Sequence, residues 1–197
     1  MRKAVSPTFT AIVAIVVAIV IVGAAVYTYQ QFLMYSSKTS AAITTTSTTP
    51  KHTLPYNPTN KTVFITLVTL SSGPTFNFNG TDFGAMVIYV PAGWNLYITF
   101  VNQQSLPHNL NLVANDTLTP NSANIANDGK ILLTIGATSS DYQSSGLMSG
   151  QSASELYTDI AAGIYWLCCG IAGHAESGMW VVLVASPNVT TPYVVIS

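Results

Sequence analysis

Residues 163–184 read GIYWLCCGIAGHAESGMWVVLV and contain two apolar runs on either side of a glycine-rich loop. Both runs are rich in β-branched and aromatic residues, which predicts two strands joined by that loop. The three glycines inside the loop allow a short backbone to fold tightly around a bound ion. The sequence therefore predicts a hairpin that holds its loop in a fixed position, which is what a binding site needs.

Cys169, His174 and Met179 follow the spacing C-x4-H-x4-M in this loop. They offer a thiolate, an imidazole and a thioether, the mixture that suits a copper ion cycling between Cu(I) and Cu(II). Zinc could use the cysteine and the histidines, but a thioether is a poor zinc ligand. The same spacing could also be two core residues and a loop histidine. The flanking strands favour the metal site, and His108 in the motif PHNL is the best candidate for a fourth ligand.

The run AGIYWLCCGIAGHAESGMWVVLV, residues 162–184, resembles the copper-binding signature of the cupredoxins, most closely the sulfocyanin and rusticyanin type. The motif PHNL at residues 107–110 is similar to the histidine motif that lies earlier in the chain of such proteins. The resemblance is dense over residues 84–114 and 155–185 and diffuse elsewhere. It implies an all-β, cupredoxin-like Greek-key sandwich over residues 61–197.

The resemblance also implies a function. A protein of this type is an electron carrier and not an enzyme, with one type 1 copper per chain and no small-molecule substrate. The implied partners are redox proteins of a respiratory chain: a cytochrome or quinol-oxidising complex as donor and a terminal oxidase as acceptor. Asn109 would hydrogen-bond near the thiolate loop and brace the two halves of the site, although a strand-edge amide is an equally good interpretation. The implied copper ligands are His108, Cys169, His174 and Met179.

Cys168 departs from the family pattern. Adjacent residues of a strand point to opposite faces, so only one of the two cysteines can face the metal. The gap of four residues before His174 selects Cys169. A relaxed disulfide between neighbouring residues is disfavoured by the separation and dihedral that such a bond prefers. We therefore expect Cys168 to be a small buried hydrophobic residue, with a redox or supporting role as the alternative.

Residues 10–29 form an uncharged, apolar segment of about twenty residues, the length that a helix needs to cross a bilayer. Arg2 and Lys3 precede it and the next basic residue is Lys38, so the positive-inside rule places the N-terminus in the cytoplasm. We therefore predict a single-pass cell-membrane protein with a lipid-embedded anchor over residues 1–35. A cleaved signal peptide is the alternative, and both interpretations export the remainder of the chain.

Residues 36–60 are rich in Ser, Thr and Pro and read as a linker that cannot bury enough surface to fold. His52 lies in this linker and is not counted as a ligand. From residue 61 onward, short β-branched runs separated by turn residues predict a β-sandwich. The polar stretches 116–130 and 139–154 read as surface excursions. The predicted strands are 62–70, 86–90, 95–102, 109–114, 131–135, 164–169, 180–184 and 193–196.

Charge is sparse in this protein, since only 7% of its 197 residues are charged. Residues 61–197 hold two lysines against seven acidic residues, a formal charge of −5, and no basic patch, which argues against nucleic-acid binding. Because there are so few carboxylates to protonate, acidification should lower the free energy of unfolding only slightly. We therefore predict that the exported domain works in an acidic medium outside the cell, as in an archaeal acidophile.

Two other classes of function compete with an electron carrier. A multicopper oxidase or nitrite reductase needs more histidines for a second copper site, and beyond the proposed ligands the chain has only His52. Catalysis by this chain alone is therefore disfavoured. A metal-free exported β-sandwich, used in adhesion or a surface layer, stays open and would be colourless.

Overall fold

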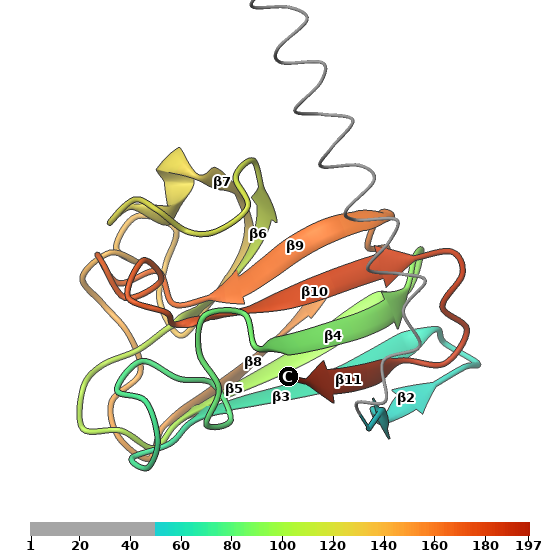
Figure 1. Ribbon diagram of the computed structural model, residues 1–197, viewed down its shortest axis with the longest axis horizontal. Helices are drawn as coiled ribbons and strands as arrows, with labels where there is room; N and C mark the ends of the chain where they lie inside the picture. The colour runs from blue at the N-terminus through green and yellow to red at the C-terminus, as the bar shows by residue number, and fades with distance from the viewer. Residues whose placement is uncertain (1–49) are drawn as a thin grey trace, which may run out of the picture. The chain divides into compact units, whose positions relative to one another are not determined.

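The computed structural model describes residues 50–197, which form two β-sheets packed face to face (Figure 1). A short 3-10 helix, η1 (Ile125–Asn127), precedes β7, and the side chain of Asn124 caps it. The strands are β1 (His52–Thr53), β2 (Tyr56–Asn57), β3 (Thr62–Thr69), β4 (Met86–Pro91), β5 (Asn95–Asn102), β6 (Leu110–Asn115), β7 (Gly129–Ile135), β8 (Ser152–Tyr157), β9 (Gly163–Cys168), β10 (Trp180–Ser186) and β11 (Tyr193–Ile196).

The chain crosses repeatedly between the two sheets. The larger sheet has the strand order β1-β11-β4-β10-β9-β6-β7, and the smaller has the order β2-β3-β5-β8. β10 pairs parallel with β4, and β3 pairs parallel with β5. Parallel neighbours cannot be joined by a tight turn, so the chain leaves the smaller sheet after β3, adds β4 to the larger one and returns for β5. The predicted all-β sandwich is confirmed.

The pairing of β6 with β9 brings two distant parts of the sequence together. These strands run antiparallel, with Asn111 opposite Cys168 and Leu112 opposite Leu167. The start of β6 and the end of β9 therefore lie at the same end of the sandwich. His108 lies two residues before β6 and Cys169 follows β9 directly, so the register places the two side by side.

A continuous apolar core lies between the sheets. β3 and β5 alternate between buried and exposed residues, as a strand with one face on a core must. The inward residues of both sheets, including Ile65, Phe100 and Leu183, form one cluster that also contains Cys169 and Met179. A second cluster, with Trp166, Trp180 and Cys168 at its centre, lies on the other side of β9 and β10.

The folded region begins earlier than the sequence predicted. β1 and β2 lie within residues 36–60, which were assigned to the linker, and pair with β11 and β3. Each strand is two residues long and mostly exposed, so neither gives a hydrophobic pattern. Among residues 50–197, no helix combines the length and hydrophobicity that a bilayer crossing requires. The predicted span at residues 10–29 lies outside the described residues.

The other correction concerns the end of the stretch 139–154, which was predicted to be a surface excursion. The structure has the strand β8 there, at the edge of the smaller sheet against β5. Its sequence, SASELY, is mostly exposed and lacks the alternation of apolar residues by which strands are recognised. The stretch 116–130 contains η1, whose Ile125 is fully buried in the second cluster.

Candidate metal centre

Three of the predicted ligands meet at one end of the sandwich. His108, Cys169 and His174 each present one ligand atom, and these atoms all lie within 4.8 Å of one another. The Sγ of Cys169 is 3.8 Å from Nδ1 of His108 and 3.5 Å from Nδ1 of His174. His108 and Cys169 are fully buried, whereas His174 is partly exposed. His52 is exposed in β1 and takes no part in this cluster.

Met179 lies at the end of the loop that carries the ligand candidates Cys169 and His174. Its carbonyl accepts a 3.0 Å hydrogen bond from the amide of Cys169, and its amide donates to the carbonyl of His174, also at 3.0 Å. Its side chain is fully buried in the same apolar cluster as Cys169. The loop is therefore pinned at its beginning, middle and end.

Asn109 links the two remote segments of the site. Its Oδ1 accepts hydrogen bonds from the amide of Gly170 at 2.7 Å and from Nδ2 of Asn111 at 2.8 Å. Its Nδ2 donates to the carbonyls of Tyr142 and Ser145, both at 2.7 Å. All four bonds are made by a side chain with no exposed surface. The predicted hydrogen bond between Asn109 and the thiolate loop is confirmed, with the amide of Gly170 as its donor.

Gly170 must approach its neighbours closely for that bond to form. A Cβ at this position would lie 2.5 Å from Nδ2 of Asn111 and 2.7 Å from the ring of Tyr142. Both neighbours are held by hydrogen bonds of their own, from Asn111 to Asn109 and from Tyr142 to Asn124. A larger residue after Cys169 would therefore push the ligand loop away from β6.

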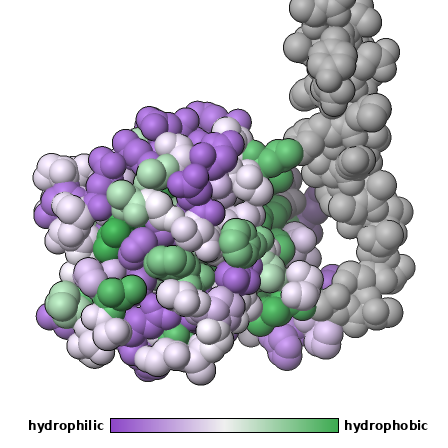
Figure 2. All heavy atoms as spheres, turned by 60° about the vertical axis from the view of Figure 1, so that its left-hand side comes forward, coloured by the Kyte–Doolittle hydropathy of each residue, from purple (hydrophilic) through white to green (hydrophobic). Residues whose placement is uncertain are grey.

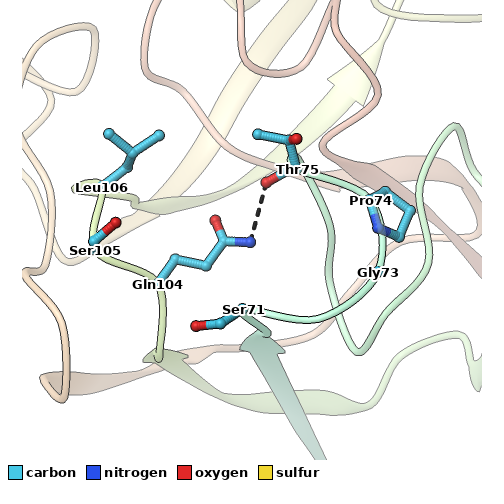
Figure 3. A pocket seen from close by; sticks show the side chains of 7 residues that line it. All are labelled: Ser71, Gly73, Pro74, Thr75, Gln104, Ser105 and Leu106. Atoms are coloured by element: carbon cyan, nitrogen blue, oxygen red, sulfur yellow. Dashed lines mark hydrogen bonds between the residues drawn. The ribbon is translucent and has the colours of Figure 1, made fainter.

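His108 is fixed through both its backbone and its ring. Its amide donates to the carbonyl of Leu147 at 3.2 Å, and its carbonyl accepts from the amide of Leu147 at 2.8 Å. Its Nε2 lies 2.8 Å from Oε1 of Gln104, and its Nδ1 faces Cys169. Gln104 also lines an open pocket of about 220 Å³ between the loops 71–75 and 104–106 (Figure 3).

His174 is the ligand candidate nearest to solvent. The ring of Phe76 packs against it with a centroid separation of 4.6 Å, and the ring of His108 lies 5.1 Å away on another side. Exposed apolar side chains occur on the loops at this end, including Leu106, Met148 and Phe83. Figure 2, which turns the left-hand side of Figure 1 forward, shows apolar residues in several patches among polar ones.

Burial controls the charge state of the metal-free site. It raises the pKa of the Cys169 thiol to about 12, while backbone hydrogen bonds at Asn109 and Ile171 act in the opposite direction. Burial, followed by repulsion from His174, lowers the pKa of His108 to about 4, and burial also lowers the pKa of His174. At neutral pH both imidazoles are therefore neutral and each has a lone pair to offer, whereas the thiol keeps its proton until a cation displaces it.

Cys168 points away from this site. It is fully buried in the second cluster, with the indole rings of Trp166 and Trp180 packed 6.0 Å apart in the same cluster. Burial, with the nearby Cys169 and Asp128, raises the pKa of its thiol well above the usual value. Both cysteines are free thiols. The prediction that Cys168 is a small buried hydrophobic residue is confirmed.

The donor atoms fit a small thiophilic cation. Bond lengths of about 2.3 Å to sulfur and 2.0 Å to nitrogen in a trigonal arrangement require sulfur–nitrogen separations of about 3.7 Å. The two separations found here, 3.8 Å and 3.5 Å, agree with that requirement. One thiolate and two imidazoles with a buried thioether in the same loop match the preference of copper better than that of zinc.

Sequence reasoning missed the residues that support the ligands. Gln104 and Phe76 contact the two histidines, and Asn102 donates to the carbonyls of Leu106 and Leu147 on both sides of His108. Asn102 is the last residue of β5 and Gln104 lies four residues before His108, and neither position carries a recognisable motif. A polar side chain at an inward position of an alternating strand, as Asn102 is in β5, was the one available signal.

Comparison with known proteins gives consistent matches. The family model for the sulfocyanin (SoxE) domain matches residues 49–196, and the model for the N-terminal region of sulfocyanin matches residues 2–49. The chain is 56% identical to the sulfocyanin of Sulfolobus acidocaldarius over 144 residues, which is 72% of each protein.

Two solved structures are similar to it at lower identity. Auracyanin from Roseiflexus castenholzii is 20% identical, covering 63% of this chain and 97% of that one with a TM-score of 0.45. Reduced rusticyanin is 24% identical, covering 64% and 77% with a TM-score of 0.45.

Proposed function

This chain belongs to the sulfocyanin family, whose members are blue copper electron carriers and not enzymes, and we propose that it passes single electrons between respiratory partners outside a membrane. Its cofactor is one type 1 copper. The observation that carries the proposal is the convergence of one thiol and two imidazole nitrogens within 4.8 Å at a buried end of the fold. We propose as ligands His108, Cys169, His174 and Met179.

The surroundings of these side chains suit outer-sphere electron transfer. When bound, copper supplies a one-electron couple between Cu(I) and Cu(II). The bonds made by Asn109 and Met179 hold the ligand atoms in place, so little rearrangement is needed when the charge changes. The partly exposed ring of His174 gives a partner protein a short approach to the site. A partly apolar surface, on which Glu176 is the exposed acidic residue of the loop between β9 and β10, supports brief docking and rapid release.

Spectroscopy and voltammetry test the copper site directly. Protein loaded with one equivalent of Cu(II) should be intensely coloured by the thiolate-to-copper transition, and the colour should bleach with a single electron. Voltammetry should show one reversible couple. A colourless, EPR-silent oxidised sample would favour the metal-free adhesion protein instead.

The proposed location rests on the sequence of residues 1–35. An uncharged segment preceded by Arg2 and Lys3 supports a cytoplasmic N-terminus with the copper domain outside. Membrane fractionation of the full chain against a version lacking residues 1–35 tests anchoring, and protease added to intact cells tests the side. Release of the domain by salt alone, or its protection in intact cells, would overturn this part.

The proposed acceptor is a terminal oxidase, and the proposed donor is a cytochrome or quinol-oxidising complex. Support comes from the family and from the sparse charge of the domain, which is suited to docking in an acidic medium. Mixing reduced, copper-loaded protein with membranes of the source organism should restore the blue colour in the presence of oxygen. Oxidase inhibitors should block that reoxidation. Reoxidation at the same rate with and without the inhibitors would contradict the proposed acceptor.

A further inference from the structure

We propose that Gln104 is a positioning residue that fixes the ring of His108 in the one state that presents its Nδ1 lone pair to the metal. The inference rests on the proposed function, because it takes His108 as a ligand. It concerns the contact at the far side of the ring, where Nε2 of His108 lies 2.8 Å from Oε1 of Gln104. A metal-binding histidine generally needs such a partner at its other nitrogen.

The amide of Gln104 can take only one orientation. Its Nε2 lies 2.7 Å from the carbonyl oxygen of Leu70 and 3.0 Å from that of Thr75, the contact drawn in Figure 3. Carbonyl oxygens only accept hydrogen bonds, so the NH2 group must face them. A flipped amide would place Oε1 against two other oxygens. The oxygen of the amide is therefore directed at His108.

The orientation of the amide decides where the proton of His108 lies. An amide oxygen has no hydrogen to give, so Nε2 of His108 must be the donor. In the neutral ring the other nitrogen, Nδ1, then carries the lone pair. The hydrogen-bond network thus assigns the proton, and Nδ1 faces Sγ of Cys169 at 3.8 Å. Leu70 and Thr75 thereby select the binding-competent tautomer through Gln104.

The position of Gln104 is itself secured. Its amide nitrogen in the backbone donates to Oδ1 of Asn102 at 2.9 Å, and the same oxygen accepts from the hydroxyl of Thr69 at 2.6 Å. The side chain is 8% exposed, and the residues around its pocket, in the loops 71–75 and 104–106, are all uncharged. Within the described residues, therefore, no ionic group beside the pocket competes for the amide.

His174 lacks an equivalent partner. Its Nδ1 faces Cys169, but within residues 50–197 no protein group is hydrogen-bonded to its Nε2. The two imidazoles of the site are thus held differently, one by a buried amide and the other by packing against Phe76. Removing Gln104 should therefore affect one ligand selectively.

A matched pair of variants tests the inference. Gln104→Met keeps the length of the side chain and removes both hydrogen-bonding groups, while Gln103→Met makes the same change at the exposed neighbouring residue. Gln104→Met should weaken copper affinity by about 10- to 100-fold in competition with a chelator. Gln103→Met should leave the affinity unchanged. Equal affinity for wild type and both variants would overturn the inference.

Imidazole nitrogen NMR of the metal-free protein reports which nitrogen of His108 carries the proton. A purely structural role of Gln104 would not change that position. In wild type, His108 should carry its proton on Nε2 alone, and Gln104→Met should add a population protonated on Nδ1. A wild-type His108 protonated on Nδ1 would overturn the inference whether or not any variant folds.

The same measurements separate this inference from the proposed function. If wild type and Gln103→Met both fail to bind copper, the proposed function is wrong, while the tautomer of His108 in the metal-free protein still decides the role of Gln104. If both bind copper and Gln104→Met matches them in affinity and tautomer, only the role of Gln104 is wrong.

Discussion

Replacing Asn109 by alanine should destabilise the domain more than any exposed substitution. The change removes four hydrogen bonds, with the amide of Gly170, Nδ2 of Asn111 and the carbonyls of Tyr142 and Ser145. At a net value of about 1 kcal/mol each, their loss should lower the free energy of unfolding by about 4 kcal/mol. That is a large part of the roughly 5–15 kcal/mol that a typical domain possesses.

Urea denaturation of the metal-free domain, followed by tryptophan fluorescence, measures this loss. For a domain of this size, about 4 kcal/mol corresponds to a fall in melting temperature of roughly 8–16 °C. Asn188→Ala is the matched control, because Asn188 is exposed and its side chain makes no hydrogen bond within the described residues. It should change the free energy of unfolding by no more than about 0.5 kcal/mol.

Copper binding provides a second measurement on the Asn109→Ala variant. Because Asn109 holds Gly170 against β6, its loss should also loosen Cys169 relative to His108 and weaken copper binding at temperatures where the protein is still folded. The reasoning would be refuted by an Asn109→Ala protein as stable as the Asn188→Ala control. It would equally be refuted by a destabilised protein that binds copper as tightly as wild type.

Three further predictions concern the ligands. Cys169→Ala should abolish the blue colour, which absorption spectra measure, and a coloured Cys169→Ala protein would contradict the assignment. Cys168→Ala should keep the colour and lower the free energy of unfolding, measured by urea denaturation, by about 1 kcal/mol through the loss of a buried sulfur. Met179→Leu should retain copper and raise the reduction potential, because an alkyl group of similar volume replaces the thioether; voltammetry showing an unchanged potential would argue against Met179 as a ligand. Affinity for Cu(II) should rise about tenfold per pH unit between about pH 7 and 9, because the Cys169 thiol, with its pKa of about 12, must release a proton on binding. Below the pKa of His108, about 4, the slope should steepen because a second proton must leave; competition titrations that find no pH dependence would exclude Cys169 as the thiolate donor.

The strands could be predicted where one face is buried. β3 and β5 alternate between apolar and polar residues, and the predicted bounds agree with the observed ones to within one residue. β8 was missed because an exposed edge strand buries too little surface to leave a pattern. β1 and β2 were missed because two residues cannot show a period.

The ligand residues of the site could be predicted because their types and spacing are visible in the sequence. A cysteine, a histidine and a methionine in one loop predict a metal, and the motif PHNL predicts His108 as a further ligand. The structure brings His108, about sixty residues earlier in the sequence, against that loop. The supporting contacts could not be predicted, because Gln104 meets His108 only after β5 and β6 are placed in different sheets. Phe76, on the connection between β3 and β4, is a similar case.

The pairing of β6 with β9 has a consequence for how the protein matures. His108 and Cys169 are 61 residues apart in sequence, so the cation site is assembled from contacts of high sequence separation. Such contacts require an entropically costly chain closure and tend to form slowly. A newly synthesised chain therefore has no high-affinity site before its sheets have assembled. We therefore expect high-affinity copper binding only once the domain has folded.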